Sequence, residues 1–561
     1  MRKTPLAAWV AGLLTLGGCG SSTHPPPPGA ECTGTSCASA MDGGVDSGVS
    51  ELGGGDSGPV LGSCDGGPCV ASCESLPANT SLGCDFVVAT PALLEVATGD
   101  CLAVFVANNG TSPILLSLSS GAQSLDAASV ARIPTGPDAT SWPQVPASGL
   151  PAGQVAVVFL SGDACPVAAV SGSTSSVTNT TGQAFRLTTS APANVYDIYP
   201  FGGATTFVPG ATLLYPSTSW GTNYVVATPR RESVYGGPQS PTNTRWIQIV
   251  AATDGTTVSL VPTTDLVGAP ANTVTTFTLD AGEYRQFAAD GEMSGSVISS
   301  DHPVALNSGN WAFNLVSKTS PSGYVDECHQ QIPPVTALGY EYVAAPYTTR
   351  LSTLAPESVP YRFVGVVNGT TLSYDPPIAG APTTLNLGDV ADFETTSPFD
   401  VKSDATHPFY IAQFMPGCVF TVPSRPDYPG STDPMLGDPE FVNVLPAKQF
   451  LSSYVFYTDV TFRTTNLVLT RRVGSGAVTV DCLGAVTSFT AVGTSGFEIA
   501  NVDLVRAGVN VGACANGPHT ASSADPFGLV VWGTDTAASY AYPAGGSVAA
   551  LTTVVVPATT Q

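Results

Sequence analysis

The sequence predicts an all-β protein of about four tandem β-sandwich-like modules, which follow a disordered N-terminal tether. Composition is the first observation, since charged residues make up only 11% of the chain while Gly, Thr, Ser, Val, Ala and Pro dominate. β-Branched and turn-forming residues favour strands over helices. The second observation is an internal repeat centred on a hairpin. A chain of 561 residues has room for about three to five domains of ordinary size.

The repeat is clearest between Trp220 and Gly309. It opens with GTNYVVATP from Gly221, continues with IQIVAATDGTTVSLVP from Ile247, passes FTLDAGEYRQF from Phe277 and closes with VISSDHPVALNSG from Val297. In the second landmark, two apolar runs flank Asp-Gly, where a tight antiparallel hairpin needs positive φ. We therefore expect strands with a hairpin in the middle.

The same landmarks recur in the same order, once upstream and twice downstream. The opening run recurs as GCDFVVATP at Gly83, GYEYVAAP at Gly339 and SSYVFYT at Ser452. Four landmarks kept in order across four copies predict tandem duplication. The predicted organisation is a signal peptide (1–18), a tether (19–63), a Cys-rich junction (64–81) and four β modules (82–219, 220–337, 338–450 and 451–561).

The N-terminus resembles a bacterial lipoprotein signal. Met1, Arg2 and Lys3 form a short basic N-terminal region, and Leu6 to Gly18 is an apolar run too short to span a bilayer. The run ends in LGGC, with the cysteine at position 19, which resembles a bacterial lipobox. Acyl chains on Cys19 would anchor the protein, since each buried methylene contributes roughly 0.8 kcal/mol. An ordinary secretory signal is the alternative. We expect export and lipid anchoring to a bacterial envelope, and the glycine after the cysteine favours the outer membrane or cell surface.

Composition and charge limit the partners. Residues 20 to 63 are rich in Pro, Gly, Ser and Asp with little to bury, which is typical of a disordered tether. The formal charge of −24 repels nucleic acid phosphates and anionic lipid. We therefore expect no nucleic acid partner, and contact with the membrane only through the lipid anchor.

Thirteen cysteines predict disulfides, because an even number remains once Cys19 is assigned to the lipid and exported proteins oxidise their thiols. A metal cluster at Cys64, Cys69 and Cys73 is the alternative, but it lacks nearby His ligands and paired CxxC spacing. We expect no metal. The sequence establishes no pairing; the candidate pairs are Cys32–Cys37, Cys64–Cys69, Cys73–Cys84, Cys101–Cys165, Cys328–Cys418 and Cys482–Cys514.

Two motifs suggest catalysis only superficially. GDSGP at Gly55 resembles the nucleophile loop of serine proteases, but it lies in the predicted tether, where a catalytic triad cannot be held rigidly. DECHQQIPP places His329 beside Cys328, yet an oxidised cysteine has no thiolate to act as a nucleophile. HExxH, P-loop and GxGxxG patterns do not occur in the sequence. We predict no catalytic residue and no cofactor.

The other histidine and acidic patterns are interpreted structurally. His302 and His407 directly precede proline in the closing landmark, where two other copies have Ala191 and Asp525. A position that accepts such different side chains is expected to be a turn leading into a strand. The Asp-rich run MDGGVDSG lacks the DxDxDG spacing of a calcium loop, so we interpret it as a solvated linker.

A longer series of motifs extends along the modules. It runs from TSWGTNYVVATP through SGSVISSDHPVALNSGN to DECHQQIPPVTALGYEYVAAP, and continues with GDPEFVNVLPAKQFLSSYVFYT and FGLVVWGTDTAASYAYPAGG. As an ordered set these motifs resemble the N-terminal domain family of IgGFc-binding proteins, over roughly residues 81–557. The resemblance implies a surface lipoprotein for bacterial members with a lipobox and tether. It supplies no catalytic residues, and Fc binding is not carried over from the family name.

We therefore predict a non-enzymatic, lipid-anchored cell-surface protein whose modules present loops for adhesion or ligand binding, with a glycan or surface protein as ligand. One candidate loop contains Arg230, Arg231 and Arg245, and a second spans residues 423–440. Replacing the three arginines is expected to weaken binding without unfolding the protein. The alternatives are a structural component of the envelope or extracellular matrix, and a polysaccharide-acting hydrolase with paired carboxylates in a groove.

Overall fold

The computed structural model describes residues 63–64, 67–68, 73, 76, 80–93, 100–206, 208–230, 244–321, 325–420 and 435–559. The predicted signal peptide, the lipidated Cys19 and nearly all of the tether lie outside these residues. The described chain is mostly β, with several curled antiparallel sheets and one short α-helix, α1 (Ala127–Val130), so the all-β prediction is confirmed. Within these ranges no helix has the length and apolarity needed to cross a bilayer.

Four groups of strands follow one another along the chain, after a short hairpin of β1 (Ser63–Cys64) and β2 (Gly67–Pro68). The first group contains β3 (Gly83–Val88), β4 (Leu102–Ala107), β5 (Leu116–Ser120), β6 (Gln123–Leu125), β7 (Ala131–Arg132), β8 (Val155–Ser161), β10 (Phe185–Tyr199) and β11 (Gly210–Leu214). The second contains β12 (Gly221–Val225), β13 (Arg245–Ala251), β14 (Thr256–Val261), β15 (Thr275–Leu279), β16 (Glu283–Ala289), β17 (Val297–Phe313) and β18 (Asp326–Ile332). It also recruits β9 (Thr180–Gln183), which pairs with β16 although it lies in the first module range.

The third and fourth groups follow the same order of strands. The third contains β19 (Glu341–Ala344), β20 (Val359–Gly365), β21 (Thr370–Thr371), β22 (Ser373–Asp375), β23 (Thr384–Leu385), β24 (Val390–Thr395), β25 (Phe399–Lys402), β26 (Phe409–Met415), β27 (Val419–Phe420), β28 (Met435–Leu436) and β29 (Glu440–Asn443). The fourth contains β30 (Leu451–Thr458), β31 (Thr464–Arg472), β32 (Val478–Val480), β33 (Gly484–Val486), β34 (Thr490–Val492), β35 (Phe497–Arg506), β36 (Val509–Asn510), β37 (Gly517–Asp535) and β38 (Ala538–Pro543). Short 3₁₀ turns are η1 (Ala139–Ser141), η2 (Gly203–Thr205), η3 (Ser217–Ser219), η4 (Val335–Ala337) and η5 (Ala447–Gln449).

Each group contains a long strand that passes from one β-layer to a second. The first half of β10 pairs with β3 and β5, and its second half pairs with β4 and β11. The strands β17 and β37 do the same, while in the third group the path is broken into β25 and β26. A strand that switches layers forms the corner of a β-sandwich. This explains why the sheets are curled.

A proline marks each corner. Proline has no N–H to donate to a ladder, so it is tolerated where strand pairing is interrupted. His302 lies within β17, at the break in its pairing, with Nδ1 3.0 Å from Asp301 Oδ1. His407 lies in the bend before β26, with Nδ1 2.9 Å from Asp404 Oδ1. Both contacts are local and exposed, but the interpretation as a turn leading into a strand fits His407 and is wrong for His302, which lies inside the strand. The corner prolines are Pro192, Pro303, Pro408 and Pro526.

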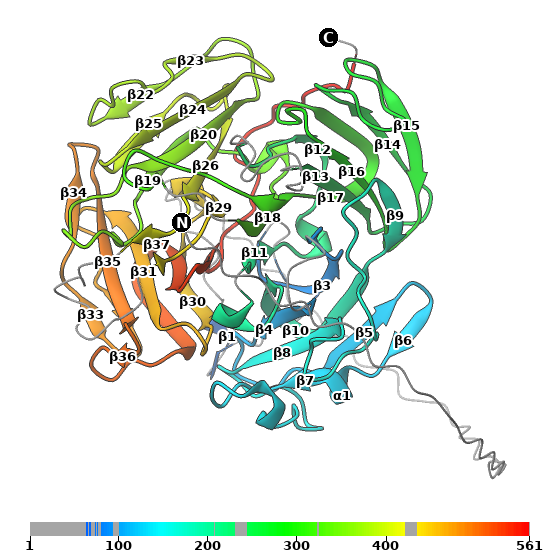
Figure 1. The fold of residues 1–561 in the computed structure, drawn as a ribbon, viewed down its shortest axis with the longest axis vertical. Coiled ribbons are helices and arrows are strands. Elements are labelled where there is room, and N and C mark those ends of the chain that lie inside the picture. The colour runs from blue at the N-terminus through cyan, green and yellow to red at the C-terminus, as the bar shows by residue number, and fades with distance from the viewer. Residues whose placement is uncertain are drawn as a thin grey trace, which may run out of the picture. The chain divides into compact units, whose positions relative to one another are not determined.

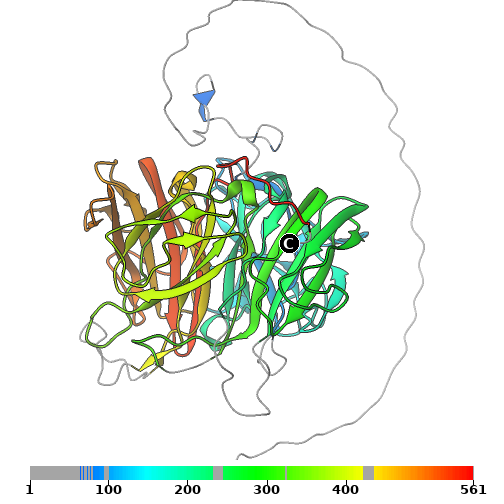
Figure 2. The same ribbon diagram turned by 90° about the horizontal axis from the view of Figure 1, so that it is seen from above.

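The last strand of each group meets its neighbours at the centre of a ring (Figure 1). β11 contacts β18 and β38, and β29 contacts the same two strands. Each of these central strands is the edge of an antiparallel sheet of four or more strands, such as β16, β13, β17 and β18 in the second group. The arrangement is similar to the blades of a propeller. Figure 2 shows the ring from the side, with the strands running between its two faces.

The hydrophobic core is shared between neighbouring groups. One cluster joins the first and fourth groups, where Tyr196 stacks on Tyr542 with ring centroids 4.5 Å apart. Others join the second to the third, the third to the fourth and the first to the second, and the first group also has a cluster of its own. Ser57–Gln561 accordingly forms one compact unit. Apart from the first group's own cluster, the groups therefore stabilise one another across their borders.

The C-terminal residues 544–559 tie the ring together across one face (Figure 2). The backbone N–H of Ser81 donates to the carbonyl of Gly546 at 2.9 Å, and the N–H of Gly546 donates back to Ser81 Oγ at 3.0 Å. Further along, the side chain of Asn223 exchanges two hydrogen bonds with the backbone of Val556, at 2.7 and 2.8 Å. This terminal segment therefore links the first group to the fourth and then reaches the second.

A tyrosine and a glycine recur at the start of the repeats. The Tyr342 hydroxyl accepts from the Gly339 N–H at 2.8 Å and donates to the Phe409 carbonyl at 2.6 Å, which fastens β19 to the start of β26. Gly339 also packs against the end of the same repeat, because an added Cβ would lie 2.4 Å from Pro446 Cβ. Equivalent hydroxyl bonds come from Tyr224 and Tyr454, equivalent glycine contacts join Gly83 to Pro216 and Gly221 to Pro334, and Phe86 replaces the tyrosine in the first repeat.

We expect Gly339→Ala to lower the free energy of unfolding by about 1–3 kcal/mol, because its methyl group would overlap the Pro446 ring at the end of the same repeat. Gly136→Ala is the matched control, since no heavy atom lies within 4 Å of the Cβ position there. Chemical denaturation of both variants measures the difference. Equal midpoints would contradict the proposed contact between the start and the end of the third repeat.

Candidate functional site

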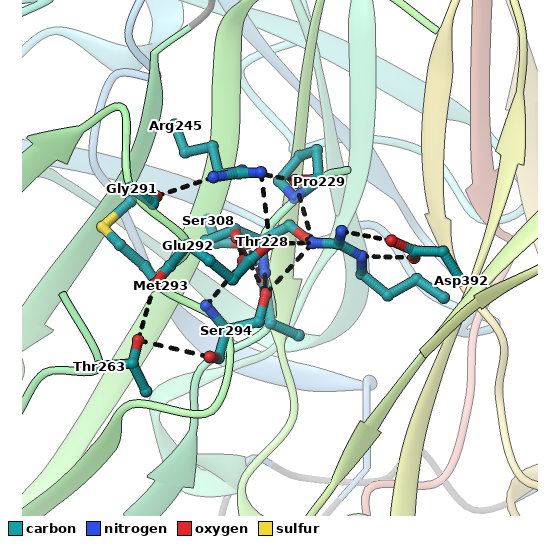
Figure 3. Close-up of polar contacts among 12 residues, drawn as sticks. Thr228, Pro229, Arg245, Thr263, Gly291, Glu292, Met293, Ser294, Ser308 and Asp392 are labelled. Carbon is teal, nitrogen blue, oxygen red and sulfur yellow. Dashed lines mark hydrogen bonds and ion pairs between the residues drawn. The ribbon is translucent and has the colours of Figure 1, made fainter. Parts of the chain in front are cut away.

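The candidate loop predicted from the sequence is held at its base by a buried guanidinium group (Figure 3). The described part of the loop ends at Arg230 and resumes at Thr244, one residue before β13 begins at Arg245. Arg245 is only 4% exposed. Its Nε donates to the carbonyl of Pro229 at 2.9 Å, and its Nη1 donates to the carbonyl of Gly291 at 2.8 Å. The side chain therefore joins the two ends of the loop to each other and to the turn before β17.

A second arginine joins this base to the third group of strands. Arg362 in β20 donates from Nη1 to the Thr228 carbonyl and to Glu292, both at 3.0 Å, and forms two 2.8 Å bonds with Asp392 in β24. Glu292 also lies 3.3 Å from Arg245, so two guanidinium groups share one carboxylate. Burial alone would raise the pKa of Glu292, but the charges of Arg362 and Arg245 lower it overall. Glu292 is therefore a stable anion at neutral pH.

Arg245 thus differs from the sequence-based expectation of a ligand-facing residue. Its side chain is buried and donates to backbone carbonyls, so it positions the loop. Arg230 is half-buried, and Arg231 lies outside the described residues. Of the second candidate loop, residues 423–440, the structure describes only the part from Met435 onward. Contacts with a ligand at the first loop would come from residues other than Arg245.

Three of the expected disulfides are formed, and they indicate an exported protein because disulfides persist in oxidising compartments. Two of them lie within a single group of strands, and the third joins the Cys-rich junction to β3. The candidate pairs Cys32–Cys37 and Cys64–Cys69 fall wholly or partly outside the described residues. The disulfides in the structure are Cys73–Cys84, Cys101–Cys165 and Cys482–Cys514.

The expected bridge between Cys328 and Cys418 is wrong, because both residues are buried thiols. Cys328 lies in β18 of the second group, where its register partner is Asn310 of β17, and Cys418 follows β26 of the third group. Each cysteine is packed in the sheet of its own group. Burial raises the pKa of the Cys328 thiol well above its usual range. This thiol is therefore neutral and enclosed, and it is not a nucleophile.

β18 places a buried charge cluster at the centre of the ring. His329 Nδ1 lies 2.8 Å from Glu327 Oε2, and its Nε2 lies 2.8 Å from Asp197 Oδ1 of β10. The three side chains are almost inaccessible to solvent. Burial alone would lower the pKa of His329, but the two carboxylates raise it well above its ordinary value. An imidazolium held between two carboxylates therefore connects the first and second groups.

Three more acids are buried nearby. Both carboxylate oxygens of Asp326 and one oxygen of each of Asp438 and Glu440 have no hydrogen-bond partner among the described residues. Burial raises the pKa of all three, and the nearby charges of Asp438 and Glu440 raise that of Asp326 further. These carboxyls are enclosed between strands. They therefore do not provide the accessible acid pair in a groove that a polysaccharide hydrolase uses.

One group of possible metal ligands occurs within the described ranges: Asp481, Cys482 and His519. Cys482 is bonded to Cys514, so its sulfur is not available as a thiolate. The remaining pair has His519 Nδ1 at 3.0 Å from Asp481 Oδ1. Two ligands are fewer than a protein zinc site requires, so this pair does not constitute a metal centre.

Sequence reasoning noticed DECHQQIPP but missed its position. All seven residues of β18 are buried, although most of them are polar. Gln331 Oε1 accepts from the N–H of Tyr215 at 2.5 Å, and Gln330 Oε1 accepts from the N–H of Asn443 at 3.2 Å, which bridges β11 to β29. The sequence does contain a signal for this central position. DECHQQI is a polar run at the end of its repeat, where the other copies have mostly small or apolar residues. Its partners lie more than 100 residues away in the sequence.

The chain is similar to a known protein family over part of this fold. The family model of the IgGFc binding protein matches residues 210–533, more than half of the chain. The chain belongs to this family. The match begins at β11 and ends within β37, so it is shorter than residues 81–557 and includes only the central strand of the first group.

The chain is also similar to a human protein of this family. The chain is 26% identical over 341 residues to the IgGFc-binding protein of Homo sapiens. The aligned region covers 59% of this chain but 6% of the human protein, so the chain spans a small part of that relative's length.

We expect Arg245→Ala to lower the free energy of unfolding by about 1–3 kcal/mol, because buried carbonyls at the loop base would lose their donor. The control is Arg472→Ala, whose side chain is 58% exposed and pairs with Glu341 at the surface. Such exposed pairs contribute about 0–1 kcal/mol. Thermal unfolding and limited proteolysis of the loop measure the effect. Unchanged stability and cleavage in Arg245→Ala would contradict a role at the loop base.

The central cluster predicts a dependence of stability on pH. Burial raises the pKa of Glu327 to about 7, despite the opposing charge of His329, whereas an unfolded glutamate titrates near about 4.3. The folded protein therefore holds more protons between these values, and its stability falls as the pH rises through them. The raised pKa of His329 acts in the same direction, because its stabilisation is lost above the pKa of the unfolded histidine.

Thermal unfolding between about pH 4.5 and pH 8, the window set by these two values, measures this prediction. We expect the midpoint to fall as the pH rises, and Glu327→Gln to reduce the slope. Asp525→Asn is the control, because that carboxyl is exposed in the corner of β37. An identical slope in wild type and Glu327→Gln would show that this cluster does not govern the pH dependence.

Proposed function

We propose that the chain is a non-enzymatic, lipid-anchored cell-surface protein that uses the β ring as a scaffold for adhesion or ligand binding. Membership of the IgGFc-binding family supports a binding role, and the disulfides support export. The lipobox that ends at Cys19 supports attachment to the bacterial envelope through an acylated N-terminus. The tether would then separate the ring from the lipid surface.

The observation that carries the proposal is the base of the first candidate loop. Arg245 and Arg362 hold it to the second and third groups through buried, charge-assisted hydrogen bonds. Binding residues are often placed on loops that a rigid scaffold positions. Arg230 and Arg231 add positive charge at this loop to a chain of net charge −24. An acidic glycan or a carboxylate-bearing surface protein is therefore the proposed ligand class.

Two observations support the non-enzymatic part of the proposal. The acids at the ring centre are enclosed, and the Cys328 thiol is buried with a raised pKa. The name of the human relative states that it binds the Fc part of IgG. Fc is therefore a ligand to test, although the aligned region is a small part of that protein.

We expect the purified protein to bind acidic glycans or intact cells, and the double substitution Arg230→Ala with Arg231→Ala to weaken binding about tenfold or more, through lost charge-assisted bonds. The control pair is Lys318→Ala with Arg472→Ala, which removes the same charge from exposed surface elsewhere. Glycan arrays, cell pull-downs and an IgG Fc surface measure binding.

The outcomes separate the competing functions. Equal loss in both double variants would assign binding to overall charge and remove the loop as the site. Silence of the folded protein towards glycans, cells and Fc would favour a structural component of the envelope or matrix. Release of reducing sugar from a polysaccharide would favour the hydrolase.

A further inference from the structure

A cavity of about 140 Å³ lies between the first and fourth groups of strands. This is a different interface from the one that carries the loop base. Its floor is formed by Trp142, Phe201 and Asp459, which are 4%, 7% and 2% exposed. Its rim includes the more exposed Pro137 and Ala164. A cavity of roughly this size accepts a group as large as benzene.

The aromatic side of the floor is held in a fixed orientation. The Trp142 and Phe201 rings meet edge to face with centroids 6.0 Å apart, and Phe201 meets Phe159 in the same way at 5.0 Å. The Trp142 indole N–H donates to the carbonyl of Gly136 at 2.7 Å, which fixes the ring. The faces of such rings carry partial negative charge and attract cations.

The opposite side supplies the carboxyl group of Asp459. Asp459 Oδ1 accepts from both the N–H and the hydroxyl of Thr461, at 2.8 and 2.6 Å. Its Oδ2 is buried and has no hydrogen-bond partner among the described residues. Burial raises the pKa of this carboxyl. A buried carboxylate oxygen without a donor is costly, and a positive charge in the adjacent cavity would stabilise it electrostatically without contacting Oδ2 directly.

The walls of the cavity are fixed by bonds that do not involve a ligand. The disulfide Cys101–Cys165 holds the wall on either side of Cys165, and the Phe201 N–H donates to the Cys101 carbonyl at 2.7 Å. Ala204 N–H donates to Thr461 Oγ1 at 3.2 Å, which joins the two groups beside the opening. A preorganised cavity loses little conformational entropy on binding.

We propose that this cavity binds a small organic cation, with an ammonium or trimethylammonium group placed against Trp142 and Phe201 and balanced by Asp459. Quaternary ammonium groups are recognised in this way by aromatic walls. A metal ion would need several oxygen or nitrogen ligands, and the prolines, alanines and aromatic rings of the walls supply none. An anion would meet the charge of Asp459. A neutral apolar ligand would leave the charge of Asp459 unbalanced.

Choline tests the proposal, and its uncharged isostere 3,3-dimethyl-1-butanol is the matched ligand control. We expect saturable binding of choline to the full chain, measured by calorimetry and by tryptophan fluorescence at constant ionic strength, and binding of the isostere about tenfold weaker or less. Asp459→Asn should weaken choline binding by a similar factor, because it removes the charge and keeps the side-chain volume. Asp525→Asn, on the exposed corner of β37, should bind as wild type does.

If Asp459→Asn does not fold, Trp142→Phe serves as the second variant, because it keeps an aromatic ring in the floor of the cavity. It should weaken choline binding without abolishing it, since Trp is the stronger partner for cations. Flotation with phosphatidylcholine vesicles, compared with phosphatidylglycerol vesicles, distinguishes a lipid headgroup from a free cation, and either source supports the site. No saturable choline binding by folded wild type, equal binding of the two ligands, or full affinity in the folded variants would overturn the proposal.

Discussion

The contact among the central strands β11, β18, β29 and β38 is the constraint on which the rest of the structure depends. Each repeat leaves apolar side chains at its borders, and these become buried only when the neighbouring repeat is in place. Closing the ring joins the first group to the fourth, and the bonds between Ser81 and Gly546 secure that junction. The family match starts at β11, so the chain outside it supplies the strands that complete the first group. Local duplication and global closure therefore act together.

The centre of the ring is polar, which is unusual for a core held by hydrophobic burial. His329 is acceptable there because Asp197 and Glu327 bond both of its ring nitrogens. A buried ion pair adds little net stability, but a buried charge without its partner is strongly destabilising. We infer that these pairs specify which repeats lie side by side. Only β18 carries this dense set of charges, so the four copies are no longer interchangeable at the ring centre.

The two proposed binding features lie at different interfaces between repeats. The loop base uses Arg245 and Glu292 from the second group and Arg362 from the third. The cation cavity uses Trp142 and Phe201 from the first group and Asp459 from the fourth. An interface between repeats brings together residue types that no single hairpin contains. Duplication followed by divergence at the borders is therefore a physical route to more than one site on one ring.

The sequence by itself determined what depends on local spacing. It predicted the strands and the hairpin turns, because turn chemistry and strand alternation act over a few residues and the repeats could be compared with one another. It offered Cys101–Cys165 as one candidate disulfide without establishing the pairing, and the structure contains that bridge. Only the tertiary structure decided the closed ring, the separate thiols of Cys328 and Cys418, and the buried role of Arg245. These outcomes depend on shared burial between segments that are far apart in the chain, and local propensity carries no information about which distant segment supplies the partner.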